Sequence, residues 1–252
     1  MSKKIIAVIP ARYKSTRFEG KPLVDILGKP MIWWVYQRVL QVNEFDNVIV
    51  ATDSELIKKA CVKHDLNVVM TSKNHSTSTE RVFEVAEIYP ANLYVVINGD
   101  EPLIVPKTIK NIIPDIYSIE PDQYYVANLI TDIKKPNEVI DPSNIKVLRD
   151  KNGYCICMSR SPIPFPQSST SFSYMKHVGV IAYNYKALKF FSNTLQGELE
   201  KIEKINELRF IENGIKIKLI KTKSDTLSVD TPKDLEKVLK IMNENNLISV
   251  SE

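Results

Sequence analysis

Short apolar runs rich in β-branched residues alternate with longer stretches of helical apolar spacing through the first half of the chain. The apolar runs predict strands at Ile5–Ile9, Asn47–Ala51, Asn67–Met70 and Leu93–Ile97. The longer stretches predict helices at Met31–Val42, Glu55–His64 and Ser78–Ile88. Because strands that alternate with helices form βαβ units, we expect an α/β fold with a mostly parallel sheet flanked by helices.

The second half of the chain has a different pattern. It predicts strands in a looser, more antiparallel order at Tyr124–Thr131, Ile145–Arg149, Tyr154–Met158 and Val178–Tyr183. A charged helix, a further strand and a closing helix are predicted at Glu198–Asn213, Ile215–Ile220 and Lys233–Asn243. The pattern therefore predicts a single domain over residues 1–252, with a smaller inserted lobe at about residues 130–195.

Composition narrows the classes of partner. The formal net charge of +4 is small and spread along the chain, and no arginine-rich arm occurs, so we expect no nucleic-acid partner. No apolar stretch is long enough to span a bilayer and no signal-peptide pattern precedes the first strand, which argues against membrane insertion. The odd number of cysteines argues against a disulfide framework and for the reducing cytoplasm.

The first strand runs directly into a loop that carries Arg12, Lys14, Arg17 and Lys21. Such a loop places positive charge at the carboxyl edge of a parallel sheet, where open α/β sheets bind ligands. Cationic side chains beside the N–H groups of a helix start suit a polyphosphate, although a solvated basic turn is the alternative. The loop lacks the Gly-x-Gly-x-x-Gly motif of dinucleotide-binding oxidoreductases, which sets that class aside.

Two carboxylates follow strand-like runs in a similar way. Asp100 comes just after the run Leu93–Ile97, and Asp230 stands between a short apolar run and Thr231-Pro232. An ordinary turn for Asp100 and a helix N-cap for Asp230 are the alternatives. Taken together with the basic loop at the same sheet edge, the two carboxylates predict a magnesium–triphosphate site.

An ordered set of motifs runs through the chain: Pro10-Ala11-Arg12-Tyr13, Gly20-Lys21-Pro22-Leu23, Gly99-Asp100-Glu101-Pro102, Ser159-Arg160, His177-Val178-Gly179 and Val229-Asp230-Thr231-Pro232. With this set the chain closely resembles the 3-deoxy-manno-octulosonate cytidylyltransferase family, to about residue 240. The resemblance implies a glycosyltransferase-A-like fold, a homodimer, and an inserted lobe that serves dimerisation and sugar binding. It also implies Mg²⁺-dependent transfer of CMP from CTP to a 3-deoxy-2-ulosonic acid, with release of pyrophosphate, in the cytoplasm for lipopolysaccharide or capsule synthesis.

The resemblance also implies roles for particular residues. Catalysis would fall to Arg12, Lys21, Asp100 and Asp230. The nucleotide would be bound by Ala11, Arg12, Ser15, Arg17, Lys21, Thr71, Ser78 and Asn98. Magnesium would be held by Asp100 and Asp230. The sugar acid would be bound by Arg160, His177, Asn206, Glu207 and Arg209.

Four positions depart from the family pattern. Asn98 replaces a usual Gln, Ser78 replaces a usual Gly, and Asn206-Glu207 replaces a usual Glu-Gln. The resemblance implies 3-deoxy-manno-octulosonate as the acceptor, and the altered positions make an 8-amino octulosonate or another acidic sugar the alternatives. An ammonium group on the sugar could pair with Glu207. A nucleotide-binding protein without turnover is the third alternative. The Pro/Ser-rich segment Pro162–Ser173 is predicted to close over the sugar.

Overall fold

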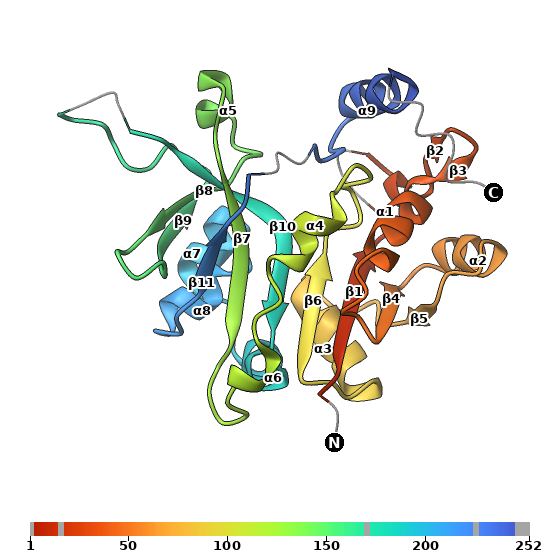
Figure 1. The fold of residues 1–252 in the computed structure, drawn as a ribbon, viewed down its shortest axis with the longest axis horizontal. Coiled ribbons are helices and arrows are strands. Elements are labelled where there is room, and N and C mark those ends of the chain that lie inside the picture. Colours follow the sequence, from red (N-terminus) through yellow and green to blue (C-terminus); the bar gives the residue numbers. More distant parts are fainter. Residues whose placement is uncertain (1–2, 15–17, 169–171, 224–226, 245–252) are drawn as a thin grey trace.

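A central β-sheet organises the chain, and the computed structural model describes residues 3–14, 18–168, 172–223 and 227–244 (Figure 1). The main strands follow one another across the sheet in the order β11-β7-β10-β6-β1-β4-β5. Their bounds are Lys218–Lys221, Val126–Asp132, Met175–Tyr183, Leu93–Ile97, Ile5–Ala11, Asn47–Thr52 and Val68–Met70. Strand β10 runs antiparallel to both of its neighbours on this path, and the other adjacent pairs are parallel. The prediction of a mostly parallel α/β sheet is confirmed.

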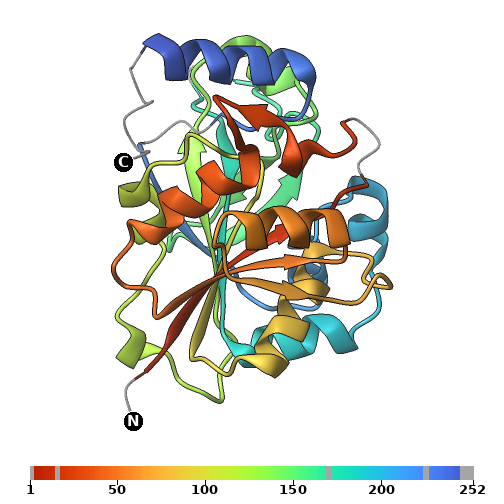
Figure 2. The ribbon, with the colours of Figure 1, turned by 90° about the vertical axis from the view of Figure 1, so that its right-hand side faces the viewer.

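Helices cover both faces of this sheet (Figure 2). In that view α1 (Met31–Leu40) and α9 (Pro232–Glu244) lie above the strands, whereas α3 (Ser78–Ile88) and α6 (Tyr185–Asn193) lie below them. Helix α2 (Glu55–Lys63) buries Ile57 and Cys61 in the same hydrophobic cluster as α1. The strands and helices predicted in the first half all occur, with ends within two residues of the predicted ones.

Alternation along β1 explains why two hydrophobic clusters form. Ile5, Ala7 and Ile9 belong to the cluster that contains α1 and α9. Ile6 and Val8 belong to the cluster that contains α3 and α6. Because successive side chains of a strand point to opposite faces, a continuous apolar run is what a strand covered by helices on both faces requires. Both faces of the sheet are therefore apolar, and polar side chains gather at the edge where the parallel strands end.

The projecting part of the molecule is shorter than the predicted lobe of residues 130–195. Strand β10 and helix α6 fall in that range, yet they belong to the central sheet and its helical layer. The physical reason is that β10 is apolar on both faces, so it is buried between β6 and β7. What projects from the central strands is the connection between β7 and β10, which carries α5 (Pro136–Ile140). Its hairpin of β8 (Lys146–Arg149) and β9 (Cys155–Ser159) continues the same sheet, because β8 pairs with β10.

The predicted single helix over Glu198–Asn213 is wrong. The chain instead forms α7 (Glu198–Glu203) and α8 (Leu208–Glu212), separated at Lys204, which adopts the left-handed conformation with φ 55° and ψ 46°. No Gly or Pro marks this break, so the local pattern could not show it. The closing helix predicted at Lys233–Asn243 lies within α9. Among the described residues no helix is long and apolar enough to cross a membrane.

Candidate active site

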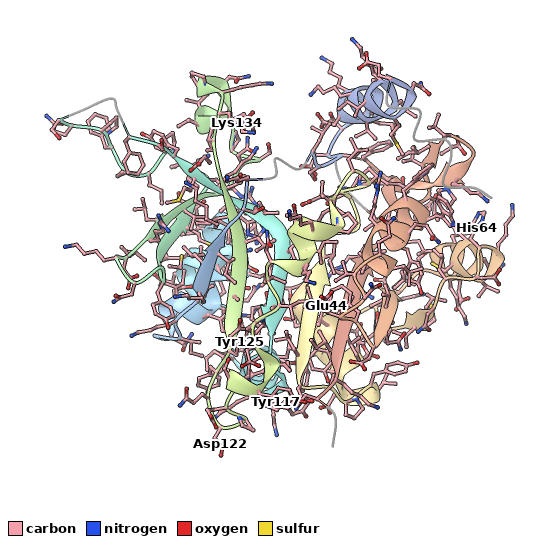
Figure 3. All side chains as sticks on the ribbon, viewed as in Figure 1. Glu44, His64, Tyr117, Asp122, Tyr125 and Lys134 are labelled. Atoms are coloured by element: carbon pink, nitrogen blue, oxygen red, sulfur yellow. The ribbon has the colours of Figure 1, made fainter. Side chains whose placement is uncertain are left out.

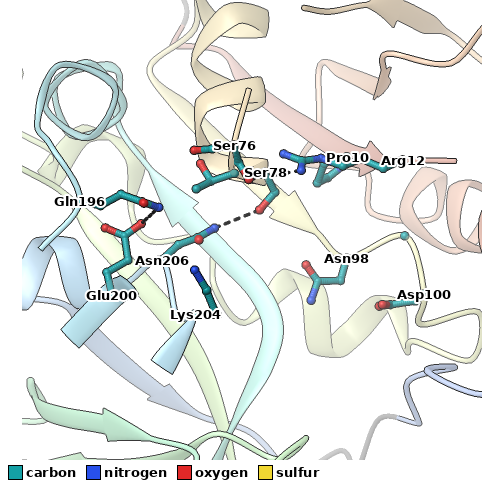
Figure 4. A pocket seen from close by; sticks show the side chains of 12 residues that line it. Pro10, Arg12, Ser76, Ser78, Asn98, Asp100, Gln196, Glu200, Lys204 and Asn206 are labelled. Atoms are coloured by element: carbon teal, nitrogen blue, oxygen red, sulfur yellow. Dashed lines mark hydrogen bonds between the residues drawn. The ribbon is translucent and has the colours of Figure 1, made fainter. Parts of the chain in front are cut away.

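Neighbouring parallel strands bring the predicted site together. Strands β1 and β6 pair in parallel, so the residues that follow them, Arg12 and Asn98-Gly99-Asp100, meet at one edge of the sheet. A cavity of about 530 Å³ opens there (Figure 4). Its lining residues are Pro10, Arg12, Ser76, Thr77, Ser78, Asn98, Gly99, Asp100, Gln196, Glu200, Lys204 and Asn206. This volume is within the range usual for small-molecule sites.

Lys21 links the two predicted metal ligands. Its Nζ lies 2.7 Å from Asp100 Oδ2 and 3.4 Å from Asp230 Oδ1, although the residues are 79 and 209 positions away in the chain. The backbone supports the pairing, because Val229 N–H donates to the Asp100 carbonyl at 2.8 Å. Asp230 does not act as the N-cap of α9, since Thr231 takes that place and donates to the Asp234 carboxylate.

The two carboxylates fit a divalent cation. Asp100 Oδ1 is buried and accepts no hydrogen bond from any residue that the structure describes. Buried carboxylate oxygens need a cationic or hydrogen-bonding partner, and oxygen ligands are those that Mg²⁺ prefers. Within the described ranges no group of three or more His, Cys, Asp or Glu side chains is close enough to hold a metal alone. Phosphate oxygens and water would therefore complete the coordination of a bound ion.

Arg12 brings positive charge to the cavity. Its Nη1 donates to the Ser76 carbonyl at 3.3 Å, while Nη2 is buried and has no hydrogen-bond partner among the described residues. Burial lowers the pKa of Arg12, and the nearby Arg81 lowers it further. Arginine remains charged in proteins even so. An unsatisfied guanidinium N–H beside a cavity is suited to bind an anion.

The start of α3 forms a wall of the cavity beside Arg12, and two departures from the family pattern meet there. Thr77 caps the helix in a capping box with Glu80. Asn206 Nδ2 donates to Ser78 Oγ at 3.2 Å and to Thr79 Oγ1 at 3.3 Å. Ser78 and Asn206 are 128 positions away from each other in the chain, so only the fold shows that these two substitutions form one contact.

Asn98 is held in place by a glycine of β10. Asn98 N–H donates to the Gly179 carbonyl at 2.9 Å, and Gly179 N–H donates to Glu101 Oε1 at 3.2 Å. A Cβ atom at Gly179 would lie 2.4 Å from both Asn98 Nδ2 and Glu101 Oε1. The absence of a side chain at this position therefore lets Asn98 line the cavity.

His177 has a defined tautomer. Asn128 Nδ2 donates to the carbonyls of Val178 at 3.0 Å and Val180 at 3.1 Å, which leaves Asn128 Oδ1 to accept from His177 Nδ1 at 2.8 Å. Burial lowers the pKa of His177, with Glu207 opposing this shift and Arg160 adding to it. The imidazole is therefore neutral at pH 7 with its proton on Nδ1, and Nε2 is a hydrogen-bond acceptor.

Glu207 is buried and does not line the cavity. Only 5% of the residue is exposed, and its Oε1 accepts from the Tyr183 hydroxyl at 3.1 Å. Burial, together with Glu207, raises the pKa of Tyr183 well above its usual value, so this hydroxyl keeps its proton and donates. The carboxylate that the sequence assigned to the sugar is engaged inside the protein.

Arg209 is also an interior residue, with 1% of its surface exposed. Its guanidinium holds both oxygens of Glu200, through Nε–Oε2 at 2.6 Å and Nη2–Oε1 at 2.7 Å. Nη1 donates to the carbonyls of Phe191 at 2.7 Å and Thr194 at 3.0 Å. Glu200, not Arg209, reaches the cavity wall, so Arg209 supports the site from behind.

Arg160 is committed to backbone carbonyls. It donates to the carbonyls of Glu203 at 2.6 Å, Pro142 at 2.8 Å and Lys204 at 3.3 Å, and it does not line the cavity. Its observed contacts hold the turn between α7 and α8.

The remaining predicted residues fall into two groups. Ala11 and Thr71 are interior: Ala11 ends β1, while Thr71 Oγ1 donates to the Thr52 carbonyl at 3.1 Å and accepts from Arg81. Ser15 and Arg17 lie outside the described residues. Sequence reasoning missed the cavity residues Ser76, Gln196, Glu200 and Lys204. Nothing in the local sequence marks them, because they come together at the cavity from segments that are far apart in the chain.

Comparison with known proteins shows the family of this chain. A family model described as cytidylyltransferase matches residues 6–217, and the chain belongs to that family. Within it, the chain is 41% identical over 245 residues to a 3-deoxy-manno-octulosonate cytidylyltransferase of Fusobacterium nucleatum, covering 97% of this chain and 99% of the relative. The resemblance found in the sequence is thereby confirmed.

Two further relatives bear on fold and acceptor. A solved structure of CMP:2-keto-3-deoxy-manno-octonic acid synthetase complexed with CTP superposes with a TM-score of 0.88 at 37% identity, covering 96% of this chain and 99% of that one. An 8-amino-3,8-dideoxy-manno-octulosonate cytidylyltransferase of a Shewanella species is 38% identical over 236 residues, covering 92% of this chain and 96% of the relative. Both acceptor types therefore occur among proteins of similar sequence.

Proposed function

We propose that this protein transfers CMP from CTP to 3-deoxy-manno-octulosonate and releases pyrophosphate. The observation that carries the proposal is the bridge from Lys21 to Asp100 and Asp230 beside a cavity that Arg12 also lines. Cations and carboxylates at the carboxyl edge of a parallel sheet match the needs of a triphosphate with a divalent ion. The relatives at about 40% identity support the choice of both substrates.

The reaction needs no nucleophile from the protein. The anomeric hydroxyl of the sugar acid would attack the α-phosphorus of CTP, a new P–O bond would form, and the bond to the β-phosphate would break. The hydroxyl proton would pass to water, and the bridging oxygen would leave with pyrophosphate, which carries the negative charge. Lys21 and Arg12 would stabilise that charge, and the cavity walls would orient the reactants.

We propose Mg²⁺ as the cofactor, held by Asp100 and Asp230. Bound there, Mg²⁺ would offset phosphate charge and polarise the α-phosphoryl group. The buried, unsatisfied Asp100 Oδ1 supports this assignment. A glycosyltransferase-A-like fold, a homodimer, a cytoplasmic location and a place in lipopolysaccharide or capsule synthesis are further proposals that rest on the family resemblance.

The unmodified octulosonate is favoured over its 8-amino derivative. A repositioned Glu207 would be the partner for an ammonium group on the sugar, but its carboxylate is buried against Tyr183 and not at the cavity wall. The other altered residue, Asn206, bonds to Ser78 and is neutral. Neither contact provides a carboxylate for an amino sugar. The relatives of similar sequence and length are named as cytidylyltransferases, which favours an enzyme over a binding protein without turnover.

Pyrophosphate release tests this function. With Mg²⁺ and 3-deoxy-manno-octulosonate, we expect kcat/KM for CTP to exceed that for UTP, ATP and GTP by about 100-fold or more, because base contacts discriminate by several kcal/mol. Chelation with EDTA should stop the reaction, and added Mg²⁺ should restore it. Equal rates with all four nucleotides, or no release with CTP, would contradict the proposal.

A further inference from the structure

The cavity has two chemically different sides (Figure 4). Arg12, Asn98 and Asp100 extend from the ends of β1 and β6, where the triphosphate is proposed to bind. The facing side comes from the region of α7 and α8 and is formed by Gln196, Glu200, Lys204 and Asn206. The acceptor has to approach from this facing side, so its charged residues bear on recognition of the sugar acid.

Lys204 is the unassigned cation of that side. Glu200 is engaged by Arg209 in a buried ion pair, with 2.6 Å between Nε and Oε2, and so it is not available to Lys204. Across the part of the chain that the structure describes, no carboxylate forms an ion pair with the Lys204 ammonium. Figure 4 shows the Lys204 side chain extending toward Asn206. An exposed ammonium at a cavity wall is free to meet an anionic ligand.

The backbone at Lys204 is built to present this side chain. Its φ of 55° lies in the left-handed region, which residues other than Gly rarely adopt. The turn is held from both directions, since Lys204 N–H donates to the Glu200 carbonyl at 2.9 Å and the Lys204 carbonyl accepts from Arg160 Nη2 at 3.3 Å. This turn fixes where the Lys204 side chain leaves the backbone, at the wall of the cavity.

Arg160 holds this turn instead of reaching the cavity. Its Nε, Nη1 and Nη2 all donate to backbone carbonyls, and Glu203 fixes the end of β9 through Ser159 Oγ at 2.6 Å. The cation at the cavity wall on this side is therefore Lys204, and Arg160 positions it.

We propose that Lys204 binds the carboxylate of the sugar acid and so selects an acidic acceptor. This inference rests on the proposed function, because it assigns a contact within the same cavity. An ammonium on a flexible stem can follow the carboxylate as the sugar is oriented for attack, and opposite charge makes the contact a charge-assisted hydrogen bond.

Three substitutions at one position separate charge from backbone conformation. Lys204→Ala and Lys204→Gly both remove the ammonium, but glycine favours the left-handed conformation that the turn requires. Both should raise KM for the octulosonate about tenfold and leave KM for CTP within about twofold. Lys204→Arg should stay within about threefold of the wild type because it keeps the charge. Lys201→Ala removes an exposed lysine of α7 that does not line the cavity, and it serves as the control.

Each outcome has a defined meaning. A normal KM in Lys204→Gly with a raised KM in Lys204→Ala would assign the effect to the backbone and overturn the proposal. Unchanged constants in all variants, or a raised KM for CTP instead, would also overturn it. Calorimetric titration of the octulosonate into wild type and Lys204→Ala tests the Lys204 contact separately from the proposed cytidylyltransferase function. Binding that weakens in the variant supports the Lys204 contact even if no turnover occurs, and that lack of turnover would count against the proposed function alone.

Discussion

Asp100→Asn is expected to lower kcat about a thousandfold while leaving the melting temperature nearly unchanged. The substitution keeps the shape of the side chain but removes the charge that Lys21 contacts at 2.7 Å and that a divalent ion would bind. The fold should tolerate it, because Asp230 remains as a partner for Lys21 and the Asp100 side chain is partly exposed. The measurement is steady-state pyrophosphate release together with a thermal melt.

The control for this prediction is Asp122→Asn. Asp122 is exposed and precedes β7 (Figure 3). Strand β7 runs in the same direction as β6, since each is antiparallel to β10, so Asp122 lies at the edge of the sheet opposite the cavity. Removing the Asp122 charge should change neither kcat nor the melting temperature. Activity of Asp100→Asn within about tenfold of the wild type would contradict the role assigned to Asp100.

Arg209→Met is expected to destabilise the protein by about 3–5 kcal/mol, since it leaves the carboxylate of Glu200 buried without its partner. For a chain of this size the melting temperature should fall by roughly 10 °C. Below that temperature KM for CTP should change little, because Arg209 contacts Glu200 and backbone carbonyls and does not line the cavity. Thermal denaturation and steady-state kinetics check the two parts.

Two further variants make the Arg209 prediction specific. Arg149→Met replaces an exposed arginine of β8 and should leave the melting temperature unchanged. Adding Glu200→Leu to Arg209→Met should recover part of the lost stability, because it removes the uncompensated charge. A normal melting temperature with a strongly raised KM for the sugar acid would instead place Arg209 in contact with substrate.

The apolar spacing of the sequence predicted the strands and helices that depend on neighbouring residues alone. Strand β1 and helix α3 appear where apolar spacing placed them, and the meeting of Arg12 with Asp100 follows from the rule that parallel strands end at a common edge. The approach of Asp230 to Lys21 was predicted by the same reasoning and by the family resemblance. These features depend on strand order and direction, which a βαβ pattern largely determines.

The hydrogen-bond and ion-pair partners of individual side chains could not be predicted in the same way. Arginine is the residue type expected to bind the carboxylate of a substrate. In the structure Arg160 instead donates to backbone carbonyls, and Arg209 donates to Glu200 and to backbone carbonyls. The contact of Asn206 with Ser78 and the break at Lys204 depend on how α7 and α8 pack against other elements. Residue type and spacing carry no information on such long-range partners.

The choice of acceptor is the sharpest test of the proposed reaction. Wild-type enzyme with CTP and Mg²⁺ would be given equal amounts of 3-deoxy-manno-octulosonate and its 8-amino analogue, and the two CMP-sugars would be measured by mass spectrometry. The carboxylates among the described lining residues of the cavity are Asp100, which pairs with Lys21, and Glu200, which pairs with Arg209. Glu207 is buried and accepts from Tyr183. Because none of these carboxylates is free to bind an ammonium group, CMP-octulosonate should be the main product. Formation of only the 8-amino product, or of no CMP-sugar, would contradict the account.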